Sequence, residues 1–358
     1  MKHVAIVWLV LFLIPPAHGA GIRDGGHGTV AGQPSDRRLS PPRTQEFDER
    51  SIVTPSEFAP ADELQMTEDT FEIVGDSLVG TVENTATIVV LTPSSSHASA
   101  VRKRFAELGG DPAHLRAWVA DYNSLWYQDY GPIYSIEKDD GASGHLVIND
   151  FVYDRFGRGD DDAVPEKIAK NEGIRDNPVT MNYEGGNFIS DGTGRCLASS
   201  RIYEQNPQLK HEQVDALMKA NLGCQTLIIL APLEDDYTHH IDLFAKLLDQ
   251  KTILVGDFVD HARNKKIMDE NARILTDTYG YRVVRTPVRS RGPANYLSHL
   301  NTFTINGYAL IPAYDIPEDQ VAARVFADAG FKPLLVPATQ LENTGGAIHC
   351  ILRSRPRI

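Results

Sequence analysis

The chain alternates short β-branched runs with amphipathic helical segments, and this alternation is the feature that most limits its fold. Runs such as residues 86–91 (ATIVVL) have the length and composition of buried strands. Segments such as residues 97–108 instead repeat apolar side chains at helical spacing and end at glycine. Alternating strands and helices are typical of the α/β class, which we therefore predict for this chain.

The same alternation continues along the second half of the chain. We predict helices at residues 265–279 and 320–329, and strands at residues 226–230, 252–255, 281–285 and 333–336. The Asn306-Gly307 pair lies between two apolar runs and predicts a hairpin. No glycine-rich phosphate loop follows a predicted strand, so a nucleotide-binding fold has little support.

The N-terminus is typical of an export signal. Lys2 gives a short positive region, and residues 4–14 form an apolar run that is too short to span a bilayer. We expect residues 1–19 to be a cleaved signal peptide, with a membrane anchor or a buried helix as the alternatives. Residues 20–65 are rich in Gly, Pro and polar side chains, which favours a flexible segment. Residues 66–358 would then form the folded domain.

Composition excludes some classes of partner. The 358 residues are 42% hydrophobic and 23% charged, as in soluble globular proteins. The net charge of −13 disfavours binding to nucleic acid, and no membrane partner is expected once the signal peptide is removed. Three cysteines in an exported chain leave at least one thiol unpaired. Cys196 and Cys224 could form a disulfide, and Cys350 is then the thiol to explain.

Five polar clusters stand apart from this pattern. In residues 126–132 (WYQDYGP), Asp129 lies among aromatic residues, and in residues 183–188 (YEGGNF), Glu184 precedes two glycines. Each of these two clusters is also compatible with an ordinary tight turn. A third cluster contains Asn301 at the start of a predicted strand, where a lone Asn most often caps structure.

The fourth cluster is residues 238–242 (THHID). In an extended segment His240 and Asp242 share a face, whereas His239 points to the other face. Two histidines and an acid also suggest a metal site, but no further ligand follows at zinc-like spacing, and we predict no metal. A buried histidine with a satisfied hydrogen bond is another alternative.

The fifth cluster is residues 345–350 (GGAIHC), in which glycines shape a turn before Cys350. A Cys-His pair can bind metal, but the other two cysteines do not flank this segment at ligand spacing. A lone Cys with a distant His and acids is a candidate nucleophile.

Taken together and in this order, the motifs WxxDxGP, EGGN, HID, LN and GGxIHC resemble the agmatine deiminase and bacterial-type peptidyl-arginine deiminase family. The likeness runs from about Trp126 to Cys350. It implies a pentein fold, which is a five-bladed pseudo-symmetric α/β propeller of ββαβ units around a central site. Residues 66–358 would then be the deiminase catalytic domain.

The resemblance implies a role for each matching position. Cys350 corresponds to the nucleophile and His240 to the general acid and base. Asp129 and Asp242 correspond to the carboxylates that hold the planar guanidinium by its N–H donors. A thiolate attacks the guanidinium carbon, and an imidazole protonates the departing ammonia and then activates water against the thiouronium. The product is a ureido group, and no step needs a metal or an organic cofactor.

The remaining positions concern support and substrate. The resemblance implies that Glu184 orients the histidine, that Asn301 lies near the nucleophile and that Trp126 contacts the substrate. In secreted relatives, arginines in the region of Arg155 and Arg158 bind the carboxylate of a C-terminal arginine. The alternative is a solvated basic loop beside the acidic residues 160–162, which could also hold a structural calcium or sodium.

Two departures from the family pattern concern substrate fit. Gln128 stands where many members have Arg, and His239 stands where Gly is frequent. The export signal favours a secreted or periplasmic enzyme that acts on peptidyl-arginine, with agmatine or free arginine as the alternative substrate. A propeller used only as a binding module is a further alternative, but the implied nucleophile and acids are all present.

Overall fold

The computed structural model describes residues 51–138, 144–292, 295–341 and 344–358. The expected signal peptide and residues 20–50 of the expected flexible segment lie outside the described residues. Within the described part of the chain, no helix is both long and apolar enough to cross a membrane.

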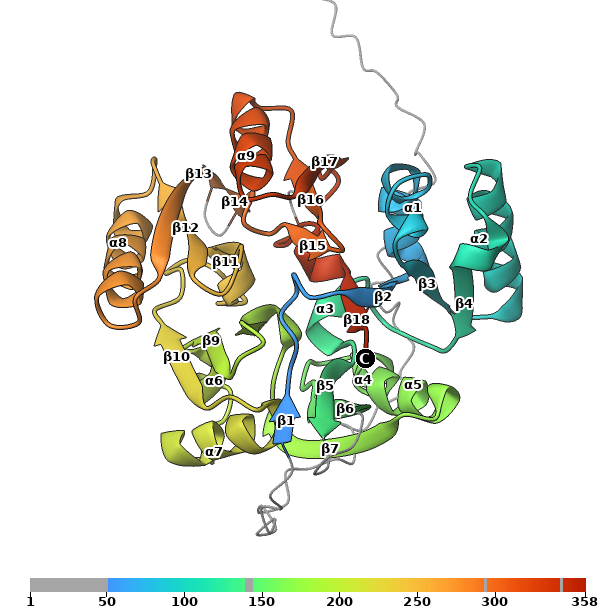
Figure 1. Ribbon diagram of the computed structural model, residues 1–358, viewed down its shortest axis with the longest axis horizontal. Helices are drawn as coiled ribbons and strands as arrows, with labels where there is room; N and C mark the ends of the chain where they lie inside the picture. Colours follow the sequence, from blue (N-terminus) through green and yellow to red (C-terminus); the bar gives the residue numbers. More distant parts are fainter. Residues whose placement is uncertain (1–50, 139–143, 293–294, 342–343) are drawn as a thin grey trace, which may run out of the picture.

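The described strands form five separate sheets of three or four strands, which Figure 1 shows arranged around a common centre. The first sheet contains, in spatial order, β1 (Ser51–Val53), β5 (Ile133–Lys138), β6 (His145–Val152) and β7 (Arg175–Asn182). The second contains β10 (Thr226–Leu230), β9 (Arg195–Ser199) and β8 (Ile189–Ser190). The third contains β11 (Ala245–Leu247), β12 (Thr252–Phe258), β13 (Arg282–Gly292) and β14 (Asn295–Leu297). The other two are β15 (Phe303–Ile305), β16 (Tyr308–Ala313) and β17 (Lys332–Pro337); and β18 (Arg353–Pro356), β2 (Ala61–Thr67), β3 (Thr87–Thr92) and β4 (Leu115–Val119). The predicted α/β class is confirmed.

Each sheet contains an antiparallel pair followed by a crossover to a parallel strand. Parallel neighbours cannot be joined by a tight turn, so each crossover carries a helix. The crossover helices are α1 (Glu68–Leu78), α4 (Gly159–Asp162), α5 (Val164–Glu172), α6 (Arg201–Glu204), α7 (His211–Leu222), α8 (Ala262–Asp277) and α9 (Pro317–Asp328), and α2 (Ser95–Glu107) precedes β4. The 3₁₀ turns η1 (Val82–Asn84) and η2 (Pro112–His114) lie in the same part of the chain as α1 and α2.

The two ends of the described chain meet in one sheet. Strand β18 pairs antiparallel with β2, so that Arg353 lies opposite Gln65 and Ser354 opposite Leu64. Strand β1 likewise pairs with β5. The expectation of a flexible segment up to residue 65 is therefore wrong for its described part. Its Gly and Pro content hides these strands, because their hydrogen-bond partners come from distant parts of the sequence.

Local patterns account for the predicted elements. In β3, five of the six residues are buried, because a parallel strand is covered on both faces. Helix α2 buries Val101 and Phe105 on the predicted face. The hairpin between β15 and β16 turns at Asn306 and Gly307, whose φ angles of 47° and 82° fit the residues that best tolerate this region. The predicted helices and this hairpin are confirmed.

A disulfide joins Cys196 in β9 to Cys224, which follows α7, with an S–S distance of 2.01 Å. Both sulfurs are buried in the apolar cluster beneath β9 and α7. Cys350 is the free thiol that remains, and it too is buried.

Four short helical turns pack against one another near the centre. They are α3 (Tyr127–Tyr130), η3 (Gly185–Asn187), η4 (Ile241–Leu243) and η5 (His349–Ile351). Each turn comes from a different part of the chain and carries or adjoins one of the polar clusters. The fold thus collects residues that are up to about two hundred positions apart into one site.

Candidate active site

Cys350 lies in η5, and its thiol is held by Asn301, which lies between β14 and β15. Nδ2 of Asn301 donates to Sγ of Cys350 at 3.2 Å. Oδ1 of Asn301 accepts from the backbone N–H groups of Ala347 and His349 at 3.1 and 3.0 Å. One side chain therefore fixes both the turn that presents the thiol and the sulfur itself.

Two carboxylates whose charges act on the Cys350 thiol each have a buried oxygen that accepts no hydrogen bond. Sγ of Cys350 lies 3.5 Å from Oδ2 of Asp242. Among the described residues, Oδ1 of Asp242 and Oδ1 of Asp129 are buried and accept no hydrogen bond. Unpaired buried acceptors are costly and uncommon in native proteins. These two oxygens are therefore candidate acceptors for the N–H groups of a cationic ligand.

His240 lies between two acids. Its Nε2 is 2.5 Å from Oε2 of Glu184, and its Nδ1 is 3.5 Å from Oδ1 of Asp129. Burial disfavours the charged ring, but the carboxylates of Asp129 and Glu184 outweigh it and raise the pKa of His240 to about 9. The imidazole is thus protonated at neutral pH and can act as an acid.

The pKa values of the two carboxylates beside His240 shift in opposite directions, although burial raises both. Burial, together with the charges of Glu184 and Asp242, raises the pKa of Asp129 to about 7, although His240 opposes this. Burial would also raise the pKa of Glu184, but hydrogen bonds and charges from His240 and Arg155 lower it to about 2. Glu184 is therefore the stable counter-ion of the histidine, and a further cation beside Asp129 would lower the pKa of Asp129 again.

Burial also raises the pKa of the Cys350 thiol well above its usual value, and the negative charges of Asp242 and Asp129 add to this effect. The thiol is therefore neutral at rest. A cation placed between the two carboxylates would cancel their repulsion of a thiolate.

Two glycines are required by close approaches in the site. A Cβ atom on Gly186 would lie 2.4 Å from Nδ1 of His240 and 2.7 Å from Oδ1 of Asp129. A Cβ atom on Gly346 would lie 2.6 Å from the Trp126 ring and 3.1 Å from Sγ of Cys350. Any larger residue at either position would displace a proposed reacting group.

A pocket of about 620 Å³ opens onto the sulfur. Its wall is formed by residues from several distant parts of the chain: Trp126, Asp129, Tyr153, Arg155, Phe156, Arg158, Asp236, Tyr237, Thr238, His240, Asn295, Thr344, Gly345 and Cys350. Phe156 and Tyr237 in this wall are strongly exposed, with 106% and 78% of their surface accessible. The pocket therefore joins a polar, buried end at the sulfur to an aromatic rim.

The two arginines expected to bind a carboxylate line this pocket but already have partners. Arg155 donates from Nε and NH2 to the two oxygens of Glu184 at 2.7 and 2.6 Å, and its guanidinium lies over the Tyr237 ring. Arg158 donates to the carbonyl oxygen of Asn123 and lies 3.7 Å from Oδ2 of Asp161. Arg158 is thus bonded within the protein, neither free to bind a substrate carboxylate nor simply solvated as in the alternative of a basic surface loop.

The structure thus brings together Cys350, His240, Asp129, Asp242, Glu184, Asn301 and Trp126, as the resemblance implies. The local geometry differs from the prediction at one point. His240 caps the start of the 3₁₀ turn η4 and Asp242 lies within it, so the two residues are not on an extended strand. His239 has a φ of 58° and points away toward Glu204. The described residues contain no group of three or more side chains suited to hold a metal ion.

Three side chains behind the site were not found from the sequence. His349 contacts Asp242, and Glu57 contacts both His349 and Lys246. His349 lies in the GGAIHC motif next to Cys350, and this position could have identified it as a residue that supports the site. Glu57 lies in a segment expected to be flexible, and nothing in its local sequence indicates a buried partner.

Comparison with known proteins gives a family match over most of the chain. The sequence profile of the Porphyromonas-type peptidyl-arginine deiminase matches residues 55–356. An agmatine deiminase of Stutzerimonas stutzeri is 23% identical over 311 residues, which cover 74% of this chain and 83% of the relative.

Solved structures of similar chains share the fold. A substrate-bound agmatine deiminase of C. jejuni superposes with a TM-score of 0.74 at 21% identity, over 88% of this chain and 99% of that one. An agmatine deiminase of Enterococcus faecalis gives a TM-score of 0.73 at 18% identity, over 86% and 96% of the two chains.

Proposed function

The chain belongs to the Porphyromonas-type peptidyl-arginine deiminase family, and on this premise we propose that Cys350 attacks the guanidinium carbon of a substrate held between Asp129 and Asp242. At the coarser level the activity is that of a guanidino-group deiminase, a hydrolase that acts on carbon–nitrogen bonds of linear amidines. The observation that carries the detailed proposal is that Asp129 and Asp242 each keep one buried oxygen without a hydrogen bond, while the other oxygen of Asp242 lies 3.5 Å from the free thiol.

The proposed reaction follows from the contacts of the site. The guanidinium donates its N–H groups to the free oxygens of Asp129 and Asp242, which fixes the plane of the cation against the sulfur. The cation also favours the thiolate of Cys350, so the thiol releases its proton to solvent and the sulfur bonds to the central carbon. His240 gives its proton to the departing ammonia, and the substrate remains as a thiouronium on the enzyme.

Hydrolysis then returns the enzyme to its resting state. The neutral His240 takes a proton from a water molecule that attacks the same carbon, and the carbon–sulfur bond breaks. The products are a ureido compound and ammonia; His240 keeps the proton taken from water, and the departing sulfur takes up the hydroxyl proton of the adduct. Glu184 keeps the ring in place throughout, because it remains ionised and bonded to Nε2.

The substrate proposed first is a small guanidino compound of the agmatine kind. The relatives described above are named for agmatine. Arg155 and Arg158 already have carboxylate or carbonyl partners, so neither is a free cation for the carboxylate of arginine. This weakens the specific argument for a C-terminal arginine.

A peptidyl-arginine substrate is the second candidate, and a specific feature favours it. The aromatic rim of Phe156 and Tyr237 is more exposed than a site for a small polar amine requires. Aromatic side chains at a pocket mouth are suited to contacts with a peptide chain.

We also propose that the protein is exported. Residues 1–19 have the composition of a signal peptide, and the Cys196–Cys224 disulfide supports an oxidising compartment. An export signal and a disulfide together are compatible with a secreted or periplasmic enzyme.

One experiment tests reaction and substrate together. Agmatine, free arginine and peptides with an internal or a C-terminal arginine are incubated separately with the enzyme, and the products are weighed by mass spectrometry. A gain of about one dalton marks exchange of a nitrogen for an oxygen. Cys350→Ala should abolish the gain. A variant that still released ammonia at the parental rate would contradict the assignment of the nucleophile, and turnover of agmatine alone would exclude the peptide substrate.

A further inference from the structure

A buried histidine behind the pocket joins two carboxylates. Nδ1 of His349 lies 2.8 Å from Oδ2 of Asp242, and its Nε2 lies 2.7 Å from Oε2 of Glu57. An imidazole can donate hydrogen bonds from both nitrogens only when it is protonated. Burial disfavours that charge, but Glu57 and Asp242 outweigh it and raise the pKa of His349. Lys246 opposes this shift, but a carboxylate oxygen lies at each ring nitrogen, an arrangement in which both nitrogens donate only as an imidazolium.

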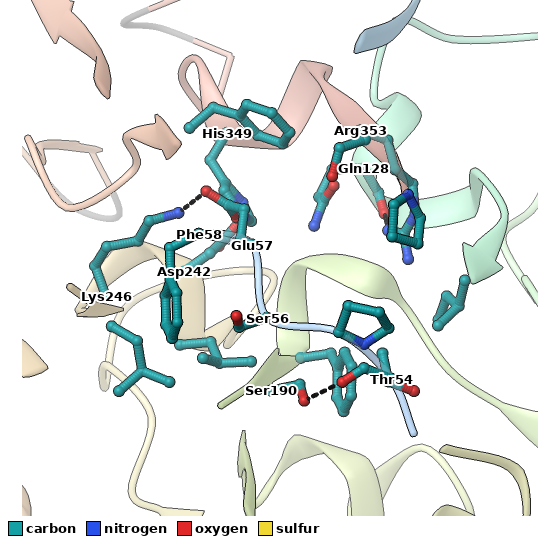
Figure 2. A pocket seen from close by; sticks show the side chains of 18 of the residues that line it. Thr54, Ser56, Glu57, Phe58, Gln128, Ser190, Asp242, Lys246, His349 and Arg353 are labelled. Atoms are coloured by element: carbon teal, nitrogen blue, oxygen red, sulfur yellow. Dashed lines mark hydrogen bonds and ion pairs between the residues drawn. The ribbon is translucent and has the colours of Figure 1, made fainter. Parts of the chain in front are cut away.

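Glu57 reaches this position from the segment between β1 and β2. Its Oε1 accepts from the backbone N–H of Thr304 at 2.5 Å and from Oγ1 of Thr304 at 2.8 Å, and Lys246 forms an ion pair with the same oxygen. Figure 2 shows Glu57 with Lys246 on one side and His349 on the other, in the wall of a cavity of about 100 Å³. The carboxylate is thus fixed at both oxygens.

The contacts determine how Asp242 is presented. His349 holds Oδ2 of Asp242, while Oδ1 is the buried oxygen that has no partner among the described residues. A carboxylate with one oxygen fixed cannot rotate freely, so the position of the other oxygen is fixed as well. We propose that Glu57 is a positioning residue, which acts through His349 to hold Asp242 in the orientation that binds the guanidinium. This inference rests on the role of Asp242 proposed above.

The charges around His349 give the proposal a specific signature. The titratable groups that face the ring are Glu57, Asp242 and Lys246. Glu57→Gln removes one of the two carboxylates that favour the imidazolium, so the ring loses its proton at a lower pH than in the parent. Neutral His349 can donate to only one neighbour, and Asp242 is then less firmly held. The defect should therefore grow as the pH rises.

The test is steady-state kinetics of the full chain, with a guanidino substrate that the parent enzyme converts, from about pH 6 to about pH 9. For Glu57→Gln we expect KM at about pH 9 to be at least about tenfold higher than that of the parent, with a smaller change in kcat. The ratio of the two KM values should return toward one at about pH 6. Taking the ratio to the parent cancels the titration of His240, which both enzymes share.

A matched control is Glu137→Gln in β5. Glu137 is also a buried carboxylate that pairs with a cation and an imidazole, Arg175 and His145, but it does not contact the site. This variant should lose stability without a pH-dependent change in KM. A purely structural role of Glu57 predicts the same result for Glu57→Gln.

A second variant keeps the proposal testable if Glu57→Gln does not fold. His349→Asn removes the imidazolium at every pH, so its KM should be raised across the whole range, and adding Glu57→Gln should change it no further. A parental KM in His349→Asn, or a ratio for Glu57→Gln that does not vary with pH, would overturn the inference. A parent enzyme that converts no guanidino compound would contradict the proposed function instead.

Discussion

Replacement of Asp242 by asparagine is the sharpest test of how the substrate is held. The change preserves the shape of the side chain and removes one negative charge beside the sulfur. Because Nδ1–H of His349 donates to Asp242, it will select the amide oxygen of the new residue. The amide NH2 group then takes the place of the free oxygen and faces the N–H groups of the guanidinium.

The size of the effect follows from this geometry. The variant loses a buried, charge-assisted hydrogen bond and gains a repulsive contact between two donors. Removing one partner of such a pair costs about 3 kcal/mol of binding free energy, so kcat/KM should fall by a factor on the order of 100. The free enzyme is not expected to suffer to the same extent, because Asp242 and Asp129 repel each other before the substrate binds.

The assay is the initial rate of ammonia release at several substrate concentrations, with thermal unfolding of each variant measured in parallel. The matched control is Asp319→Asn, because Asp319 is a buried acid bonded to His299 at 2.8 Å but does not line the pocket. The control should lose stability and retain kcat/KM. A folded Asp242→Asn enzyme with kcat/KM within about threefold of the parent would refute the reasoning.

Three other variants test neighbouring parts of the structure. The proton of His240 is present below its pKa of about 9 and is lost above it, so kcat should fall as the pH rises through this value. Glu184→Gln should move this fall in kcat to lower pH. A fall at the same pH in the variant and the parent would contradict the pairing of His240 with Glu184. Gly186→Ala places a methyl group 2.4 Å from Nδ1 of His240, so we expect most activity to be lost while the circular dichroism spectrum stays native; full activity would mean that the turn is free to shift. Replacing Cys196 and Cys224 by serine opens a link between residues 28 positions apart and should lower the free energy of unfolding by about 3 kcal/mol, as measured by urea titration, with kcat unchanged in the folded enzyme.

Local patterns in the sequence were sufficient for most of the scaffold. Helices α2, α8 and α9 and the hairpin at Asn306-Gly307 follow from apolar spacing and turn residues, which act over a few positions. The polar clusters around Asp129, His240 and Cys350 were also visible in the sequence. Their order supported the resemblance to the deiminase family, which the match over residues 55–356 confirms.

The supporting contacts of the site could not be read from the sequence in the same way. Arg155 was expected to meet a substrate carboxylate, but its two donor groups bond to Glu184. Strand β2 was expected to be part of a flexible segment, but it pairs with β18 from the other end of the chain. In both cases the partner is distant in the sequence, so no periodicity or turn signal marks the pair.

The sequence by itself determined many of the elements and which side chains are candidates for the chemistry, because propensity, periodicity and motif order are local properties of the chain. Only the tertiary structure decided which oxygen of Asp242 is free, that the Cys350 thiol is kept neutral and that Glu57 lies behind His349. Hydrogen-bond partners, burial and pKa values depend on distances between groups. Those distances are set only when the strands and turns from both ends of the chain have packed around the centre.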